Sequence, residues 1–284
     1  MKFFSFAAAL LLAGYILNPV VIAQNKADKA DKAYKARSFC SDNWSNGDKV
    51  SVKDLREFNV AATGNLNVDG GKNGGVSVKG ENRSDVLVRA CVQAWGNSDA
   101  EARSLLSGIR IDTGSTIKAE SSIDQNWSVS YEILVPRNTS LVLEAHNGGI
   151  SIKSVDGNIE FSTTNGGVNL ADLSGTVKGR TTNGGVNVSL TGNTWRGSGM
   201  DVATTNGGVN LTVPYGYAAT FETGTTNGGF KSDVAELTVQ QEDNRKESWA
   251  RSKRVIASMN GGGAPIKVTT TNGGVRIGSG SNEM

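Results

Sequence analysis

One stretch of the sequence predicts the fold: Asn147-Gly-Gly-Ile-Ser-Ile-Lys-Ser-Val-Asp-Gly-Asn-Ile-Glu-Phe-Ser-Thr-Thr-Asn-Gly-Gly-Val-Asn-Leu170. A glycine recurs in it every nine residues, and apolar residues follow each glycine two and four positions later, as at Ile150 and Ile152. Alternation with a period of two is typical of a strand that buries one face. The stretch therefore predicts short strands separated by glycine-rich corners.

The same corner recurs along the chain, mostly in its second half. Asn-Gly-Gly occurs eight times, and two threonines precede it in five of these places. From Asn147 the corners follow at steps of 18, 18, 23 and 21 residues, and a further 45 residues lead to the last one. Repetition at a fixed period is the signature of stacked repeats. The predicted structural corners are Asn147, Asn165, Asn183, Asn206, Asn227 and Asn272.

We therefore predict an all-β protein that contains a β-solenoid with about 18–23 residues per coil. Ile150, Val168 and Val186 are expected to form one internal column, and Ile159 and Val177 a second one. The corner glycines are expected to supply the positive φ that a tight turn needs. Stacked asparagine side chains are expected to hydrogen-bond along the axis. A meander of hairpins is the alternative, because Asn-Gly is also a strong hairpin signal.

The remaining segments suggest a domain organisation. Residues 39–145 are predicted to form a less regular β region with one short helix, opened by the capping box Ser98-Asp-Ala-Glu101, which covers the N-terminal end of the solenoid. Residues 146–279 form the repeat solenoid, with a charged excursion at 240–258. Residues 280–284 are a tail.

The first 23 residues have the organisation of a secretory signal peptide. Lys2 precedes a mostly apolar run, and the small residues Val21 and Ala23 place cleavage after Ala23. An uncleaved membrane anchor is the alternative. We predict an exported protein without stable membrane insertion after cleavage, located in the periplasm, on the cell surface or outside the cell. Residues 24–38 are predicted to be a flexible basic spacer; attraction to an anionic surface is the other interpretation.

Two cysteines fit an oxidising compartment. Cys40 and Cys91 form an even pair in a chain predicted to be exported, which favours a disulfide; two buried free thiols are the alternative. A metal site is not expected, because His146 is the only histidine and no Cys-x-x-Cys spacing occurs. No cofactor is predicted.

Composition narrows the class of protein further. The 284 residues include 36 glycines but only 4 prolines, which excludes collagen. A formal net charge of +2 argues against a disordered polyelectrolyte and against a nucleic-acid partner.

Residues for catalysis are sparse. The sequence lacks the motifs of zinc proteases, serine hydrolases, P-loop proteins and dinucleotide-binding proteins. Asp156, Asp172 and Glu160 fall at different or isolated coil positions and are interpreted as surface residues. We predict no catalytic residue and a protein that is not an enzyme.

Three aromatic residues are the candidate ligand contacts. Trp195 lies in a five-residue insertion, and Tyr215 and Tyr217 belong to the next coil. Aromatic rings on one flank of a solenoid could stack on sugar rings. The other interpretation is that these rings pack against each other and cover a seam.

Several motifs together carry a family resemblance. The segments Ser130-Tyr-Glu-Ile-Leu-Val-Pro136 and Leu141-Val-Leu-Glu-Ala-His-Asn-Gly-Gly-Ile-Ser-Ile152, followed by repeated Thr-Thr-Asn-Gly-Gly-Val, resemble the bacterial putative-adhesin domain family, over about Val50–Gly278. The resemblance implies an exported or surface-associated β-solenoid of undefined biochemical activity, with no catalytic residues to carry over. The expected role is adhesion or binding to a surface polysaccharide or protein ligand. The alternative is a carbohydrate-active β-helix enzyme of the lyase or glycosidase type.

Overall fold

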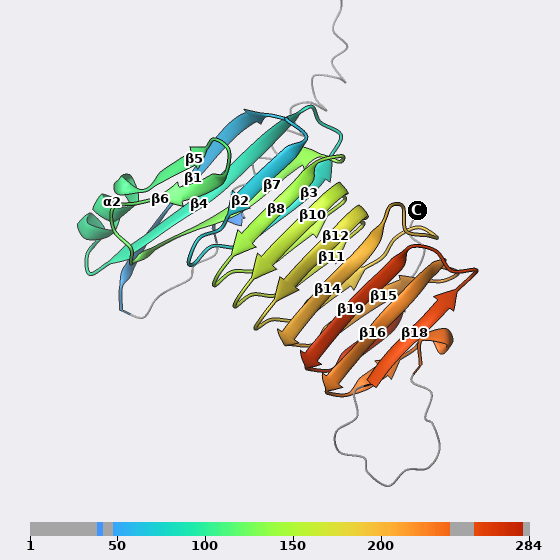
Figure 1. The fold of residues 1–284 in the computed structure, drawn as a ribbon. Helices are drawn as coiled ribbons and strands as arrows, with labels where there is room; N and C mark the ends of the chain where they lie inside the picture. The colour runs from blue at the N-terminus through green and yellow to red at the C-terminus, as the bar shows by residue number, and fades with distance from the viewer. Residues whose placement is uncertain (1–38, 42–47, 239–252, 281–284) are drawn as a thin grey trace, which may run out of the picture. The chain divides into compact units, whose positions relative to one another are not determined.

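The computed structural model describes residues 39–41, 48–238 and 253–280, and its compact unit from Asn43 onward is built from two large sheets (Figure 1). Sheet A contains ten strands in the spatial order β1 (Val50–Ala61), β4 (Asp85–Gly96), β7 (Trp127–Pro136), β3 (Val76–Glu81), β9 (Ile150–Lys153), β11 (Val168–Ala171), β13 (Val186–Ser189), β15 (Val209–Pro214), β20 (Val275–Gly280) and β17 (Phe230–Ser232). Sheet B contains ten strands in the order β18 (Lys253–Met259), β16 (Ala219–Asn227), β19 (Pro265–Asn272), β14 (Gly199–Asn206), β12 (Ser174–Thr181), β10 (Asp156–Thr163), β8 (Ser140–Ala145), β2 (Asn65–Asp69), β6 (Ile117–Glu120) and β5 (Arg110–Thr113).

Each repeat contributes one strand to each sheet, and neighbouring repeats pair in parallel. Val168 pairs with Ile150 on one side and with Val186 on the other. In sheet B, Ile159 pairs with Val177. These registers confirm both predicted internal columns. They also rule out the hairpin meander for these repeats, because hairpins pair antiparallel strands.

Apolar side chains from both sheets fill the space between them. Ile150, Val168, Val186 and many similar residues are fully buried in one core cluster. Gly179 interrupts the apolar pattern, because the ring of Phe161 lies where a side chain at Gly179 would be: a Cβ there would lie 2.2 Å from the Phe161 Cζ. The two adjacent coils thus share the volume of one large side chain.

The corner glycines were expected to provide positive φ, but the structure requires glycine there for a different reason. The first glycine of a repeat corner, such as Gly166, is not among the residues with positive φ, so the prediction of a left-handed corner is wrong. A Cβ on Gly166 would lie 2.0 Å from the carbonyl oxygen of Gly148, and a Cβ on Gly184 equally close to that of Gly166. Only glycine permits this approach between stacked coils.

Asparagine amides join the corners in a continuous ladder, as predicted. Each Asn Nδ2 donates to the Oδ1 of the preceding corner over 2.7–3.1 Å. The buried first threonine of each Thr-Thr-Asn-Gly-Gly motif adds a second link, because its Oγ1 donates to the carbonyl of the first corner glycine in the adjacent coil, as from Thr181 to Gly166 over 2.8 Å. In stacking order, the ladder contains Asn73, Asn147, Asn165, Asn183, Asn206, Asn272 and Asn227.

The last coil in the sequence is not the last coil in the stack. Strand β19 lies between β14 and β16 (Figure 1). Strand β20 likewise lies between β15 and β17. Asn272 accordingly donates to Asn206 and accepts from Asn227. The C-terminal segment therefore fills a place between two coils that are consecutive in the sequence.

Two predicted boundaries differ from the structure. Residues 253–258 of the expected excursion belong to β18, which pairs antiparallel with β16 at the end of sheet B. Residues 239–252, with Trp249, lie outside the described residues. Parallel pairing also begins before residue 146, because β2 pairs with β8 and β3 pairs with β9. The region preceding the repeats therefore contributes a coil of its own.

The rest of the N-terminal region is mainly antiparallel. Strand β4 pairs antiparallel with β1 and β7, and β5 pairs antiparallel with β6. The predicted short helix is α2 (Asp99–Gly108), whose first turn is capped by a hydrogen bond from the Glu101 amide to the Ser98 Oγ.

The predicted disulfide is present, since Cys40 and Cys91 are both disulfide-bonded. The predicted signal peptide and most of the basic spacer lie outside the described residues. Within the part of the chain that the structure describes, no helix has the length and apolar character needed to cross a bilayer.

The close approach at the corners predicts opposite outcomes for two adjacent glycines. Gly166→Ala should lower the free energy of unfolding by about 1–3 kcal/mol, because its Cβ would overlap the Gly148 carbonyl. Gly167→Ala is the matched control, since its Cβ would meet its nearest atom at 3.7 Å and the change should be nearly neutral. Urea unfolding followed by circular dichroism measures both, and equal stability of the two variants would contradict the stacking explanation.

Candidate functional site

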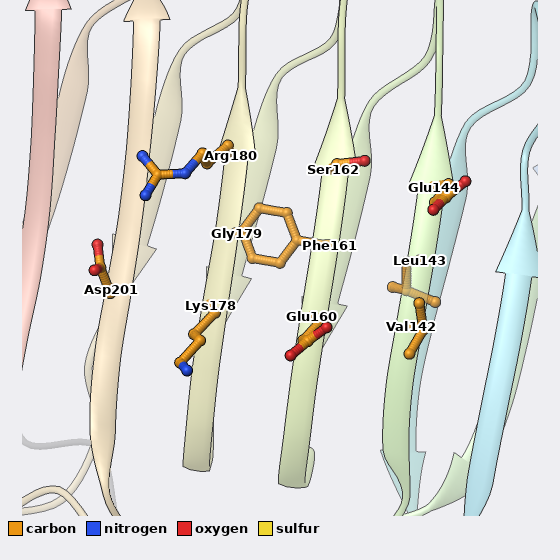
Figure 2. A pocket seen from close by; sticks show the side chains of 10 residues that line it. All are labelled: Val142, Leu143, Glu144, Glu160, Phe161, Ser162, Lys178, Gly179, Arg180 and Asp201. Carbon is orange, nitrogen blue, oxygen red and sulfur yellow. The ribbon is translucent and has the colours of Figure 1, made fainter.

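A groove lies on the outer face of sheet B, across the neighbouring strands β8, β10, β12 and β14 (Figure 2). Phe161 and Gly179 belong to its lining, and the figure shows the Phe161 ring beside Gly179, between β10 and β12. The other lining residues are Val142, Leu143, Glu144, Glu160, Ser162, Lys178, Arg180 and Asp201.

Strand alternation explains why polar side chains gather there. Ile159 and Phe161 point into the core, so Glu160 and Ser162 between and beside them point outward. The parallel register repeats this arrangement on each neighbouring strand. One outward row contains Val142, Glu160, Lys178 and Asp201, and the next contains Glu144, Ser162 and Arg180.

The charged side chains of the groove have no ion-pair partners among the described residues. This sets them apart from charges further along the same outer face, where Glu222 pairs with Arg254 over 2.9 Å and with Lys267 over 3.6 Å. The unpaired set comprises Glu144, Glu160, Lys178, Arg180 and Asp201. These groups are therefore available to a ligand without first breaking a salt bridge.

The sign of the charges changes from strand to strand across the groove. Glu144 on β8 and Glu160 on β10 make one half acidic, whereas Lys178 and Arg180 on β12 make the centre basic; Asp201 follows on β14. Neighbouring strands lie about 4.8 Å apart, so the acidic and basic groups stand one to two strand spacings from each other. Along the direction of stacking the groove is thus acidic, then basic, then acidic again.

The predicted aromatic surface is wrong for two of its three residues. Trp195 is only 5% exposed, and its Nε1 donates to the Gly175 carbonyl over 3.0 Å. Tyr217 is 1% exposed and lies 6.2 Å from the Phe221 ring, and burial raises the pKa of its hydroxyl to about 12. Tyr215 alone is exposed, at 84%. Trp195 and Tyr217 are therefore buried residues of the core cluster, and the ring that Tyr217 contacts is that of Phe221.

A second hollow lies beside Tyr215. Asp233, Glu236 and Met259 contribute to its lining, together with Asn260, whose Nδ2 donates to the Tyr217 carbonyl over 3.0 Å. It is built from strand ends, turns and a short 3-10 helix at the C-terminal part of the stack, whereas the groove on sheet B is built from paired strands. Strands hold side chains in fixed positions more firmly than turns do, so the groove is the stronger candidate.

The acidic residues and the histidine considered from the sequence lie at different places in the structure. Asp156 is exposed at the start of β10, and His146 is exposed at a corner. Glu160, interpreted as isolated in the sequence, joins the groove. Asp172 lies at another corner and accepts hydrogen bonds from the Ser154 Oγ over 2.7 Å and the Thr191 Oγ1 over 2.8 Å. Among the described residues, no group of three His, Cys, Asp or Glu residues is placed to hold a metal ion.

Asp172 has a structural role with a pH signature. Partial burial would raise the pKa of its carboxyl, but the hydrogen bonds from Ser154 and Thr191, with Arg137 and Arg196 nearby, bring the pKa below its usual value. A lowered folded-state pKa means that this stabilisation is present above the unfolded pKa and is lost as the pH falls through the folded-state pKa.

Asp172→Asn should therefore destabilise the protein by about 1 kcal/mol or less at pH 7, since the side chain is partly exposed. Asparagine tolerates the left-handed backbone at this position, which has φ 50°, so the change removes mainly the charge. Thermal unfolding from pH 7 down to strongly acidic pH should show the difference from wild type shrinking as the pH falls. The exposed Asp156→Asn is the control; a pH-independent Asp172→Asn effect would contradict the assignment.

Comparison with known proteins defines the class. Residues 138–278 match the family model described as Toastrack DUF4097, and over these residues the chain belongs to that family of domains of unknown function. The match covers the repeats, and it is shorter than the range Val50–Gly278 over which the sequence resembles the family.

Two solved structures of bacterial proteins are similar to this chain. One is a putative cell adhesion protein from Clostridium sporogenes ATCC 15579, with 11% identity, a TM-score of 0.41, and coverage of 81% of this chain and 100% of that one. The other is a putative adhesin from Bacteroides fragilis NCTC 9343, with 10% identity, a TM-score of 0.34, and coverage of 80% and 97%. No curated protein gives a significant match.

Proposed function

We propose that this protein is an exported β-solenoid that binds a surface polysaccharide or protein ligand at the cell envelope, in an adhesion role and without catalysis. The apolar leader at residues 1–23 supports export, and the disulfide of Cys40 and Cys91 is typical of oxidising compartments outside the cytoplasm. Membership of the Toastrack family agrees with this proposal but names no ligand.

The groove of unpaired charges carries the proposal. Its polar side chains stand on β8, β10, β12 and β14, each of which is hydrogen-bonded to a neighbour on both sides. Strands held in this way fix the backbone positions and the spacing of the outward residues, while their long side chains become ordered when a ligand binds. A solvent-facing set of charges at a spacing set by the sheet suits recognition of a ligand.

A carbohydrate-active enzyme is the second candidate, because three carboxylates line the same groove. Glycosidases act through two carboxylates that flank the scissile bond, and the acid is usually shielded from water so that it stays protonated. Glu144 and Glu160 are both exposed instead. Exposure therefore favours binding over hydrolysis at this groove.

One experiment tests the proposal against this alternative. The mature protein with its disulfide intact is applied to an array of glycans and matrix proteins, and bound glycans are then analysed for newly formed reducing ends or unsaturated products. We expect retention on at least one ligand class without cleavage. Absence of binding to every surface polymer would contradict the proposal, and product release would establish the enzyme instead.

Tyr215→Ala extends the test to the remaining aromatic candidate. This side chain is the exposed member of the predicted aromatic set, so its removal leaves the core unchanged. Unchanged retention of this variant on the array would exclude Tyr215 as a ligand contact.

A further inference from the structure

We propose that the groove on sheet B binds a saccharide segment that carries both amino and carboxylate groups, with the amino group on the acidic half and the carboxylate on the basic centre. This inference rests on the proposed binding function and names the chemical class of its ligand.

The first step is the arrangement of charge. Glu144 and Glu160 on β8 and β10 attract a cationic group, and Lys178 and Arg180 on β12 attract an anionic group. A ligand of one sign would meet repulsion in part of the groove. A ligand with both signs, separated by about 5–10 Å across one to two strand spacings, meets attraction in both parts, whereas an anionic group that extended past β12 would meet Asp201 on β14.

The second step is the lack of internal pairing. Side chains of opposite sign on neighbouring strands often pair, as Glu222 does with Lys267 further along the stack. Lys178 stands between Glu160 and Asp201 in the same outward row, yet within the described residues it forms no ion pair. Its ammonium group is therefore free to bind a carboxylate through a charge-assisted hydrogen bond.

The third step excludes a peptide bound as an added strand. Extended peptides commonly bind by pairing with the free edge of a sheet. The four strands of the groove are all interior to sheet B, so they offer no unpaired backbone edge. A ligand on this face must bind through its substituents, and saccharides present such groups along their length.

The fourth step is the chemistry of the remaining lining. Ser162 offers a hydroxyl that can both donate and accept, which matches sugar hydroxyl groups. Val142 is 42% exposed and offers an apolar surface to the C–H face of a sugar ring. No large exposed apolar side chain other than Val142 belongs to the described lining, so an apolar ligand is not favoured.

The test uses the mature protein and oligosaccharides of equal length in calorimetry. The probes are a neutral N-acetylglucosamine oligomer, a glucosamine oligomer, a galacturonate oligomer, and a de-N-acetylated oligomer of alternating glucuronate and glucosamine. We expect the mixed-charge oligomer to bind at least about tenfold more tightly than the neutral one, and binding to weaken as salt is raised.

Paired variants locate the site. Lys178→Gln with Arg180→Gln, and separately Glu144→Gln with Glu160→Gln, should each weaken binding of the mixed-charge oligomer by about tenfold. The matched control for the cations is Lys153→Gln with Arg276→Gln, which removes two exposed cations from the outer face of sheet A. The control for the acids is Asp124→Asn with Asp156→Asn, both exposed. The two control pairs should bind as wild type does.

The outcomes separate this inference from the proposed function. Equal binding of neutral and mixed-charge oligomers, no binding of the mixed-charge oligomer, or full binding by the groove variants would overturn the inference. Tighter binding of a short peptide with one lysine and one glutamate would also overturn it. If wild type still binds an array ligand in these cases, the proposed function stands; if wild type binds nothing on the array, both fail.

Discussion

The close approach of glycine backbones at the corners is the constraint on which the rest of the structure depends. The first glycine of one corner lies against the carbonyl of the same glycine in the next coil, where no side chain fits. This contact sets equivalent residues one above the other. The asparagine ladder and the buried threonine hydroxyls then satisfy polar groups of the corners between coils. The corners at one edge of the stack therefore fix the pairing register of the strands that they connect.

That register also creates the groove. Because each coil repeats the last, outward residues from β8, β10, β12 and β14 form straight rows, and the strand spacing sets how far apart their charged residues stand. The core allows this arrangement, since the Phe161 ring and Gly179 together fill one internal layer. The same geometry accommodates β19 and β20 between earlier coils, because any coil with the correct corner continues the ladder. The in-register stacking of the coils thus produces both the fold and the candidate site.

Much of the fold could be predicted from the sequence, and each feature that could not be predicted has a physical reason. The columns of Ile150, Val168 and Val186 and the ladder of asparagines followed directly from the period. The reason for the corner glycines did not, because a sequence cannot distinguish positive φ from close approach. The groove could also have been predicted, since Val142, Glu160 and Lys178 are spaced by 18 residues and therefore share one outward row. Burial of Trp195 depends on how the insertion packs, and the place of the last coil depends on pairing between distant segments.

The insertion of the last coil tests in-register stacking most directly. Neighbouring ladder residues lie about one strand spacing apart, within reach of a disulfide, whereas residues two coils apart lie beyond it. Oxidation of a protein with Asn206→Cys and Asn272→Cys, followed by peptide mapping by mass spectrometry, should show an intramolecular link between these two positions. The pair Asn206→Cys and Asn227→Cys should remain unlinked. A link between positions 206 and 227, with none between 206 and 272, would contradict the account.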